Sequence, residues 1–180
     1  PLVDFETVQD KYPPDEYHMF IALGYQNLNQ LRSNRYQQAK DKGFKLASYI
    51  DSKSNIPKDF IAGDNCFVMS NALIHPKVVL GNNVFVWSGA MIGHHSIIGD
   101  HCWLTSCANI SGGVTVGHNC FFAVNSTIAN SLSIGNSCFI GSNTILTKCT
   151  ANNEVYIEAS TKKFRLNSNQ FLKISNIENL

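Results

Sequence analysis

Aliphatic residues recur at every sixth position through the middle of the chain. The series has no insertion, and small or apolar residues occupy the position four places later in each unit. Side chains alternate between the two faces of a strand, so the aliphatic residue of each unit should point into a core. A fixed short period predicts a solenoid of stacked coils. The aliphatic series is Ala62, Val68, Ile74, Leu80, Val86, Ile92, Ile98, Leu104, Ile110, Val116, Phe122, Ile128, Ile134, Ile140 and Leu146.

Three units per coil give a repeat of 18 residues and about five coils, stacked about 4.8 Å apart. One column at this spacing is aromatic and should point outward, because each member precedes an inward aliphatic residue. Such a ladder needs a cover. The cover is either the chain's own terminal segments or another subunit, and we favour the subunit interface. The column consists of Phe67, Phe85, Trp103, Phe121 and Phe139.

The ends of the chain lack the six-residue period. Residues 18–25 and 44–50 read as strands that flank a helix over 27–43, which Gly43 closes. We therefore divide the chain into a partial α/β (βαβ) domain at 1–56, a mainly β solenoid at 57–150 and a C-terminal cap or tail at 151–180. Residues 171–174 are expected to pack back on the solenoid end. One βαβ unit is too small to stand alone, so we expect the front half of the α/β domain to be missing. The chain opens with Pro1 instead of Met, so we also expect the native N-terminus to be missing.

Composition narrows the class of partner. The net charge is +1 and 15% of residues are charged, so nothing predicts charge-driven binding to nucleic acid. No apolar run reaches the length of a membrane-spanning helix. Four of the six cysteines fall in one inward column, which indicates packed free thiols in a cytoplasmic protein, although an occasional disulfide stays open. They are Cys66, Cys102, Cys120 and Cys138.

The sequence GHHSIIGD at residues 93–100 is the sharpest candidate for chemistry. His94 and His95 fall at a turn of the solenoid, and Gly112 and Gly113 lie one coil further on. Two glycines without side chains beside two histidines predict an open slot at this turn. Histidine is suited to proton transfer near neutral pH. The competing interpretation is that both histidines are merely polar turn residues.

These repeats resemble the left-handed parallel β-helix of hexapeptide-repeat acyltransferases. Residues 93–135 are similar to the core of the sialic-acid O-acetyltransferases and nucleotide-aminosugar N-acetyltransferases. FIALGYQNLNQLR and KGFKLASYIDSKSNI resemble the second half of that family's sugar-nucleotide-binding domain. The resemblance implies acetyl-CoA as cosubstrate, a small-molecule sugar acceptor, a homotrimer and a role in bacterial surface-glycan biosynthesis.

The resemblance also implies roles for individual residues. His94 matches the general base, with His95 beside it where those relatives have an acidic residue. Gly112, Gly113, Val124 and Ser142 match or adjoin positions where relatives lay CoA along the prism. Trp103, nine residues beyond His94, stands where they have a second histidine near the thioester, so we include it among the cofactor-binding candidates.

Three functions stay open from the sequence. They are N-acetylation of a nucleotide-linked aminosugar, O-acetylation of a sugar of the sialic-acid type, and a non-catalytic trimeric β-helix that binds a ligand. The replacement of the acidic residue by His95 and of the second histidine by Trp103 motivates the third. No metal is expected, because the histidines lack the His-x4-His spacing of zinc-binding β-helix trimers. The acceptor sugar and the length of the acyl chain are not identified.

Overall fold

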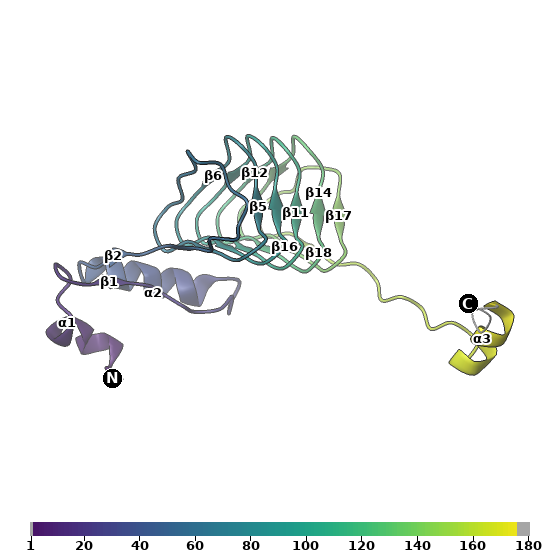
Figure 1. The fold of residues 1–180 in the computed structure, drawn as a ribbon, viewed down its shortest axis with the longest axis horizontal. Coiled ribbons are helices and arrows are strands. Elements are labelled where there is room, and N and C mark those ends of the chain that lie inside the picture. The colour runs from purple at the N-terminus through teal and green to yellow at the C-terminus, as the bar shows by residue number, and fades with distance from the viewer. Residues whose placement is uncertain (1, 176–180) are drawn as a thin grey trace.

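The computed structural model describes residues 2–175, and its centre is a solenoid of three parallel sheets (Figure 1). Every sheet pair is parallel, and paired residues inside the solenoid differ by 18 positions, as in Trp103 with Phe121. The seven-stranded face contains β3 (Tyr49–Ile50), β4 (Phe67–Val68), β7 (Phe85–Val86), β10 (Trp103–Leu104), β13 (Phe121–Phe122), β16 (Phe139–Ile140) and β18 (Val155–Tyr156).

The other two faces are shorter. The five-stranded face contains β5 (Leu73–Ile74), β8 (Met91–Ile92), β11 (Asn109–Ile110), β14 (Thr127–Ile128) and β17 (Ile145–Leu146). The four-stranded face contains β6 (Val79–Leu80), β9 (Ile97–Ile98), β12 (Thr115–Val116) and β15 (Ser133–Ile134). A mainly β parallel solenoid is therefore confirmed, consistent with the left-handed β-helix that was predicted.

The number of coils differs slightly from the prediction. β3 pairs with β4, and β18 pairs with β16, although both strands lie outside the predicted solenoid. Ile50 of β3 keeps the six-residue phase through Ile56 to Ala62, whereas β18 does not. The solenoid therefore has about six coils, about one more than predicted. In the last coil Phe139 pairs with Val155, a step of 16 residues, so the final turn is tighter than the others.

A residue with positive φ closes every turn from Asn65 to Asn143. This left-handed conformation is uncommon for residues other than glycine, but asparagine adopts it more readily than most. The left-handed backbone conformation of the turns thus explains why so many of their residues are asparagine. The series is Asn65, Asn71, Lys77, Asn83, Gly89, His95, His101, Cys107, Gly113, Asn119, Asn125, Ser131, Ser137 and Asn143.

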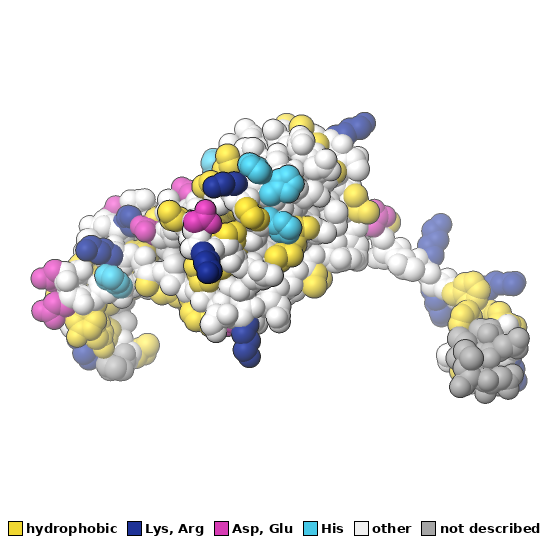
Figure 2. All heavy atoms as spheres, turned by 45° about the horizontal axis from the view of Figure 1, so that its top comes forward, with side chains coloured by type: hydrophobic (Ala, Val, Ile, Leu, Met, Phe, Trp, Pro, Cys, Tyr) yellow, Lys and Arg dark blue, Asp and Glu magenta, His cyan; other side chains and the backbone are white. Residues whose placement is uncertain are grey.

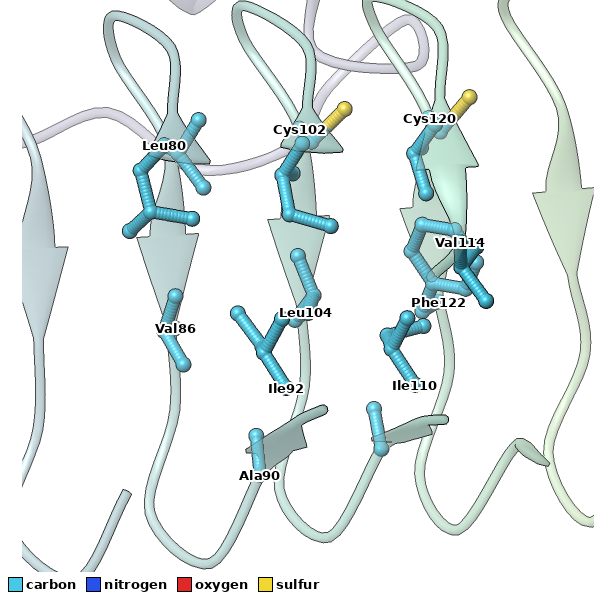
Figure 3. Packing of buried hydrophobic residues seen from close by; sticks show 14 of the residues in the cluster. Leu80, Val86, Ala90, Ile92, Cys102, Leu104, Ile110, Val114, Cys120 and Phe122 are labelled. Carbon is cyan, nitrogen blue, oxygen red and sulfur yellow. The ribbon is translucent and has the colours of Figure 1, made fainter. Parts of the chain in front are cut away.

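The core fills the inside of the prism (Figure 3). The predicted cysteine column is buried, and all six cysteines are free. Each buried thiol also donates to a backbone carbonyl of the next coil, as Cys102 does to Gly117 over 3.1 Å. Burial raises the pKa of Cys66 to about 11, so that thiol stays protonated at neutral pH.

The N-terminal residues form a small layer against the solenoid. After η1 (Phe5–Thr7) and α1 (Val8–Lys11), β1 (His18–Met19) pairs in parallel with β2 (Lys45–Leu46), and α2 (Gln30–Asp41) connects them. Gly43 follows α2 with φ +89°, as the sequence predicted for a helix end. Residues 18–46 thus contain a strand–helix–strand unit, and its assignment to a sugar-nucleotide-binding domain stays a prediction.

Arg32 of α2 is fully buried against the solenoid. Its guanidinium donates to the side chain of Asn83 (3.0 Å), to that of Asn29 (3.0 Å) and to the carbonyl of His101 (2.8 Å). It also lies over the ring of Phe85, 4.6 Å from the centroid. Burial lowers the pKa of Arg32 to about 10, which still leaves it charged at neutral pH.

The aromatic ladder on the seven-stranded face is covered by this N-terminal layer. Phe20 stacks on Phe85 with ring centroids 5.9 Å apart, and Tyr25 contacts Trp103 at 5.3 Å. Trp103 is consequently only 5% exposed. The interpretation of this ladder as a subunit interface was wrong, because the chain's own residues 20–32 occupy its face.

The C-terminal residues leave the solenoid after β18. The helix α3 (Ser168–Ser175) lies at the end of an extended segment, away from the solenoid (Figure 1). The expectation that residues 171–174 pack back on the solenoid end was therefore wrong. Residues 176–180 lie outside the described part of the chain. Within residues 2–175 no helix is both long and apolar enough to cross a membrane.

Replacing the buried guanidinium tests what attaches the N-terminal layer. We expect Arg32→Met to lower the free energy of unfolding of this layer by about 3 kcal/mol, since buried acceptors lose their donor. Hydrogen exchange should show lost protection at residues 18–46 and retained protection at 67–146. Arg35→Met is the matched control, because Arg35 is 37% exposed and forms a surface pair of little energetic weight. Equal effects of both variants would contradict the assignment.

Candidate active site

The candidate site lies on the edge where the five-stranded face turns into the four-stranded face. We call this the His edge, formed by the turns at residues 75–78, 93–96, 111–114 and 129–132. His94 and His95 occupy one turn, between β8 and β9, and both side chains are exposed. Figure 2 shows histidine side chains gathered on the solenoid, with basic and acidic side chains beside them.

The ring of His94 lies directly over Gly112. A Cβ atom on Gly112 would come within 2.7 Å of both Cε1 and Nε2 of His94. The bare backbone of Gly112 is therefore what leaves room for the imidazole in this position. The neighbouring backbone fixes the register, because the amide of Gly113 donates to the carbonyl of His94 over 2.8 Å.

His94 and His95 contact each other through their Nδ1 atoms, which are 3.1 Å apart. Of the two nitrogens, one must carry a proton and the other must accept it. When Nδ1 of His94 donates to His95, Nε2 of His94 is left unprotonated above Gly112. In that arrangement Nε2 of His94 can accept a proton, and His95 takes the place of the carboxylate or carbonyl that often holds such a histidine. The opposite arrangement, in which His95 donates, satisfies the same contact.

Ser96 holds the turn beneath the histidines. Its side chain is fully buried, and its hydroxyl donates to the carbonyl of Ser111 over 3.0 Å. The same hydroxyl accepts the amide of Val114 over 3.1 Å. One inward side chain thus fixes both ends of the Gly112–Gly113 turn. Sequence reasoning placed Ser96 in the inward series but did not identify this support.

A hollow of about 360 Å³ opens beside the histidine pair, and we call it the glycine hollow. Both predicted histidines and both predicted glycines line it, so the structure brings these four residues together. The sequence analysis missed its remaining members, although an 18-residue step from Gly93, Gly112 and Gly113 leads to all three of them. They are Ser111, Asn130 and Ser131.

The other three predicted residues lie elsewhere on the chain. Trp103 lies on the seven-stranded face under Tyr25, on the side of the prism opposite the His edge. Val124 and Ser142 are exposed in two successive turns between the seven-stranded and five-stranded faces. A single chain therefore does not bring Trp103, Val124 or Ser142 to the glycine hollow.

Metal chemistry finds no support in the described residues. Between residues 2 and 175 no three histidine, cysteine, aspartate or glutamate side chains are grouped so that they could hold an ion. The histidine pair has its Nδ1 atoms turned toward each other, which is a hydrogen-bonded arrangement.

Adding a methyl group at Gly112 tests the position of His94. We expect Gly112→Ala to displace the His94 ring and break its contact with His95, because the new Cβ would overlap the imidazole. Long-range ¹H–¹⁵N NMR of the imidazole nitrogens measures this change. The thermal unfolding midpoint should change little, since the atoms that must move end an exposed side chain.

Gly113→Asn is the matched control for Gly112→Ala. Gly113 has φ +68°, and asparagine occupies the equivalent position in several other turns. A Cβ there would meet nothing nearer than Ser131 at 3.5 Å. The His94 resonances should be preserved in this control. Unchanged resonances in Gly112→Ala would show that His94 does not lie over Gly112.

Two family profiles match parts of the solenoid. The profile described as bacterial transferase hexapeptide (six repeats) matches residues 63–94. The profile described as hexapeptide repeat of succinyl-transferase matches residues 113–148. Among curated proteins, none matches the chain.

Solved structures share the fold over most of the chain. PerB from Caulobacter crescentus, in complex with CoA and GDP-perosamine, is 22% identical with a TM-score of 0.80, covering 86% of this chain and 73% of its own. The acetyltransferase domain of PglB from Neisseria gonorrhoeae, in complex with acetyl coenzyme A, is 18% identical with a TM-score of 0.81, covering 88% and 76%. WeeI from Acinetobacter baumannii is 14% identical with a TM-score of 0.57, covering 88% and 75%.

The matches to solved structures agree with the parallel β solenoid of this chain, and the matches to the two profiles agree with the six-residue period of its sequence. Hexapeptide repeats are thus confirmed at residues 63–94 and 113–148, as the sequence predicted.

Proposed function

We propose that the chain is an acetyl-CoA-dependent acetyltransferase that transfers the acetyl group to an amine of a nucleotide-linked sugar. The observation that carries the proposal is the hydrogen-bonded His94–His95 pair beside the glycine hollow. The hexapeptide repeats support an acyltransferase. The shared fold with PerB, which is described with CoA and GDP-perosamine, supports a nucleotide-sugar acceptor.

His94 acts as the general base in this proposal. Nε2 of the neutral imidazole accepts a proton from the sugar amine as the amine nitrogen attacks the thioester carbonyl carbon. A C–N bond forms, the C–S bond breaks, and the imidazolium returns the proton to the leaving thiolate. His95 keeps Nδ1 of His94 engaged, so Nε2 faces the reacting groups. No covalent acyl-enzyme is required when both substrates are held together.

The glycine hollow suits the thioester end of acetyl-CoA. Its lining is small and polar around Gly112 and Gly113, so an extended chain with amide groups can lie close to backbone N–H and C=O groups. Volumes of several hundred cubic ångströms are typical of small-molecule sites. Backbone amides at such a turn can also stabilise the negative charge that develops on the thioester oxygen.

We propose that the working assembly is a homotrimer located in the cytoplasm. Val124 and Ser142 lie on a different edge from His94, so a second copy is needed to bring that edge to the glycine hollow. The exposed apolar residues Val79, Ile97 and Ile145 on the outer faces supply contact surface now that the aromatic ladder is covered. Free thiols fit a reducing compartment, and the reaction belongs to bacterial surface-glycan biosynthesis.

Removing the base tests the chemistry. We expect His94→Ala to lower kcat about 10²- to 10⁴-fold, the usual contribution of a positioned general base. His95→Gln should cost less, because an amide still offers the His94 Nδ1–H an acceptor. A thiol-release assay with acetyl-CoA and a panel of nucleotide-linked aminosugars measures both variants. His118→Ala, a turn histidine on another edge, is the control.

The same assay separates the remaining functions. Thiol release that requires an aminosugar and is lost in His94→Ala supports N-acetylation. Release only with free sialic acids would replace it with O-acetylation. Wild-type turnover unaffected by His94→Ala would remove His94 from the mechanism, and silence with no CoA binding would favour a non-catalytic ligand-binding solenoid.

The assembly is tested separately. Multi-angle light scattering of the purified protein should give the mass of three 19.9-kDa chains. Ile97→Asp, a charge placed on the four-stranded face, should shift the mass toward one chain and reduce turnover with it, since an unpaired charge would then be buried in an apolar contact. A monomeric wild type with full turnover would contradict the trimer.

A further inference from the structure

A second hollow lies on the His edge, on the other side of the histidine pair from the glycine hollow. It has a volume of about 440 Å³ and lies between residues 57–63 of the first coils and residues 75–80 of the next. We call it the Lys77 hollow. The turn that carries Lys77 directly precedes the turn of His94 and His95, because β6 pairs with β9. The amide of His95 donates to the carbonyl of Pro76 over 3.2 Å.

The lining of the Lys77 hollow differs from that of the glycine hollow. Phe60, Ile61 and Leu80 form an apolar wall, while Lys77, His75 and the carboxylate of Asp59 are the polar members. An apolar wall with a few directed polar groups is the usual composition of a small-molecule site. The C–H faces of a sugar ring can pack on such a wall while its charged group meets the cation.

Lys77 is free to take an anionic ligand. Its only ion pair within residues 2–175 is with Asp59, over 3.8 Å, with both side chains mostly exposed. A pair that long and that exposed is weak, so a phosphate or carboxylate can compete for the ammonium group. Lys77 also has φ +65°, a conformation that asparagine or glycine adopts more readily. The backbone conformation of this turn therefore gives no reason for a lysine at position 77.

We propose that the Lys77 hollow is the acceptor subsite and that Lys77 binds an anionic oxygen group of the sugar, a phosphate or a carboxylate. The proposal rests on the proposed acetyl transfer, because it places the acceptor on one side of His94 and the thioester on the other. Successive coils are about 4.8 Å apart, so the turns of Lys77 and His94 are separated by about the width of one sugar ring. The acceptor is thereby predicted to be an anionic sugar.

Binding to the full chain tests the subsite without turnover. The probes are UDP-N-acetylglucosamine for the phosphate, N-acetylneuraminic acid for the carboxylate and methyl glucoside as a neutral sugar, measured by calorimetry. We expect Lys77→Asn to weaken the anionic probe about tenfold, the scale of a lost hydrogen bond to a charged group. Asparagine suits the left-handed turn, so the fold should persist. Lys77→Arg should retain most of the affinity, and the Kd for CoA should not change.

Asp59 provides a test with the opposite sign. Asp59→Asn frees Lys77 from its ion pair and removes a carboxylate near the ligand, so the anionic probe should bind more tightly. The gain should be smaller when Asp59→Asn is made in the Lys77→Asn background, because only the lost carboxylate acts there; an equal gain in both backgrounds would show that Lys77 does not bind the anion. Lys53→Asn is the matched control, because Lys53 is an exposed lysine of the first coils in a turn of another edge.

The outcomes are decisive for the subsite and separate from turnover. Binding of one anionic probe alone identifies the charged group, and binding of both shows that either group is accepted. Equal binding of the neutral sugar, no binding of either anionic probe, or unchanged affinity in Lys77→Asn would overturn the proposal. Lys77-dependent binding in a protein that releases no thiol would retain the subsite and remove the transfer reaction.

Discussion

Stacking of coils in register, 18 residues apart, is the constraint on which the rest of this structure depends. Backbone amides of one coil donate to carbonyls of the coils on either side, so an inward side chain must fit directly against its neighbour in the column. Each turn must also close through a left-handed residue. A side chain at a turn consequently has predetermined neighbours, and for His94 that neighbour is Gly112. The room for the imidazole is thus built into the period of the sequence.

The N-terminal layer depends on a different kind of contact. The turn residues Asn83 and His101 present polar groups at one edge of the seven-stranded face, and Arg32 donates to the side chain and carbonyl of Asn83 and to the carbonyl of His101. A buried cation is costly unless its donors are used, and here carbonyl and amide oxygens supply the partners instead of a carboxylate. The aromatic ladder supplies apolar surface around it. This combination explains why the layer covers that face and leaves the other two available.

The solenoid was predictable because its signal is local and repeats many times. Its last strand was not, because Val155 joins the sheet through pairing with a neighbouring coil after a shorter step. The first strand was missed although Ile50 and Ile56 keep the aliphatic period. The 18-residue spacing predicted about half of the candidate site, because it placed Gly112 beside His94. Trp103 was assigned by resemblance, yet nine residues are half of an 18-residue coil and lead to the opposite side of the prism. No sequence pattern predicted the burial of Arg32, since arginine on a helix is usually exposed.

The placement of two hollows on one edge follows from the same stacking. Because every coil contributes one turn to the His edge, the turns of Lys77, His94 and Gly112 form a line along the prism. The Lys77 hollow has an apolar lining with a cation, and the glycine hollow has a small and polar lining. The histidine pair lies between the two hollows. A single coil can therefore be altered at its turn without changing the inward residues that hold the stack. In such a fold the acceptor preference can diverge at residues 57–63 and 75–80 while the base and its glycine neighbour are kept.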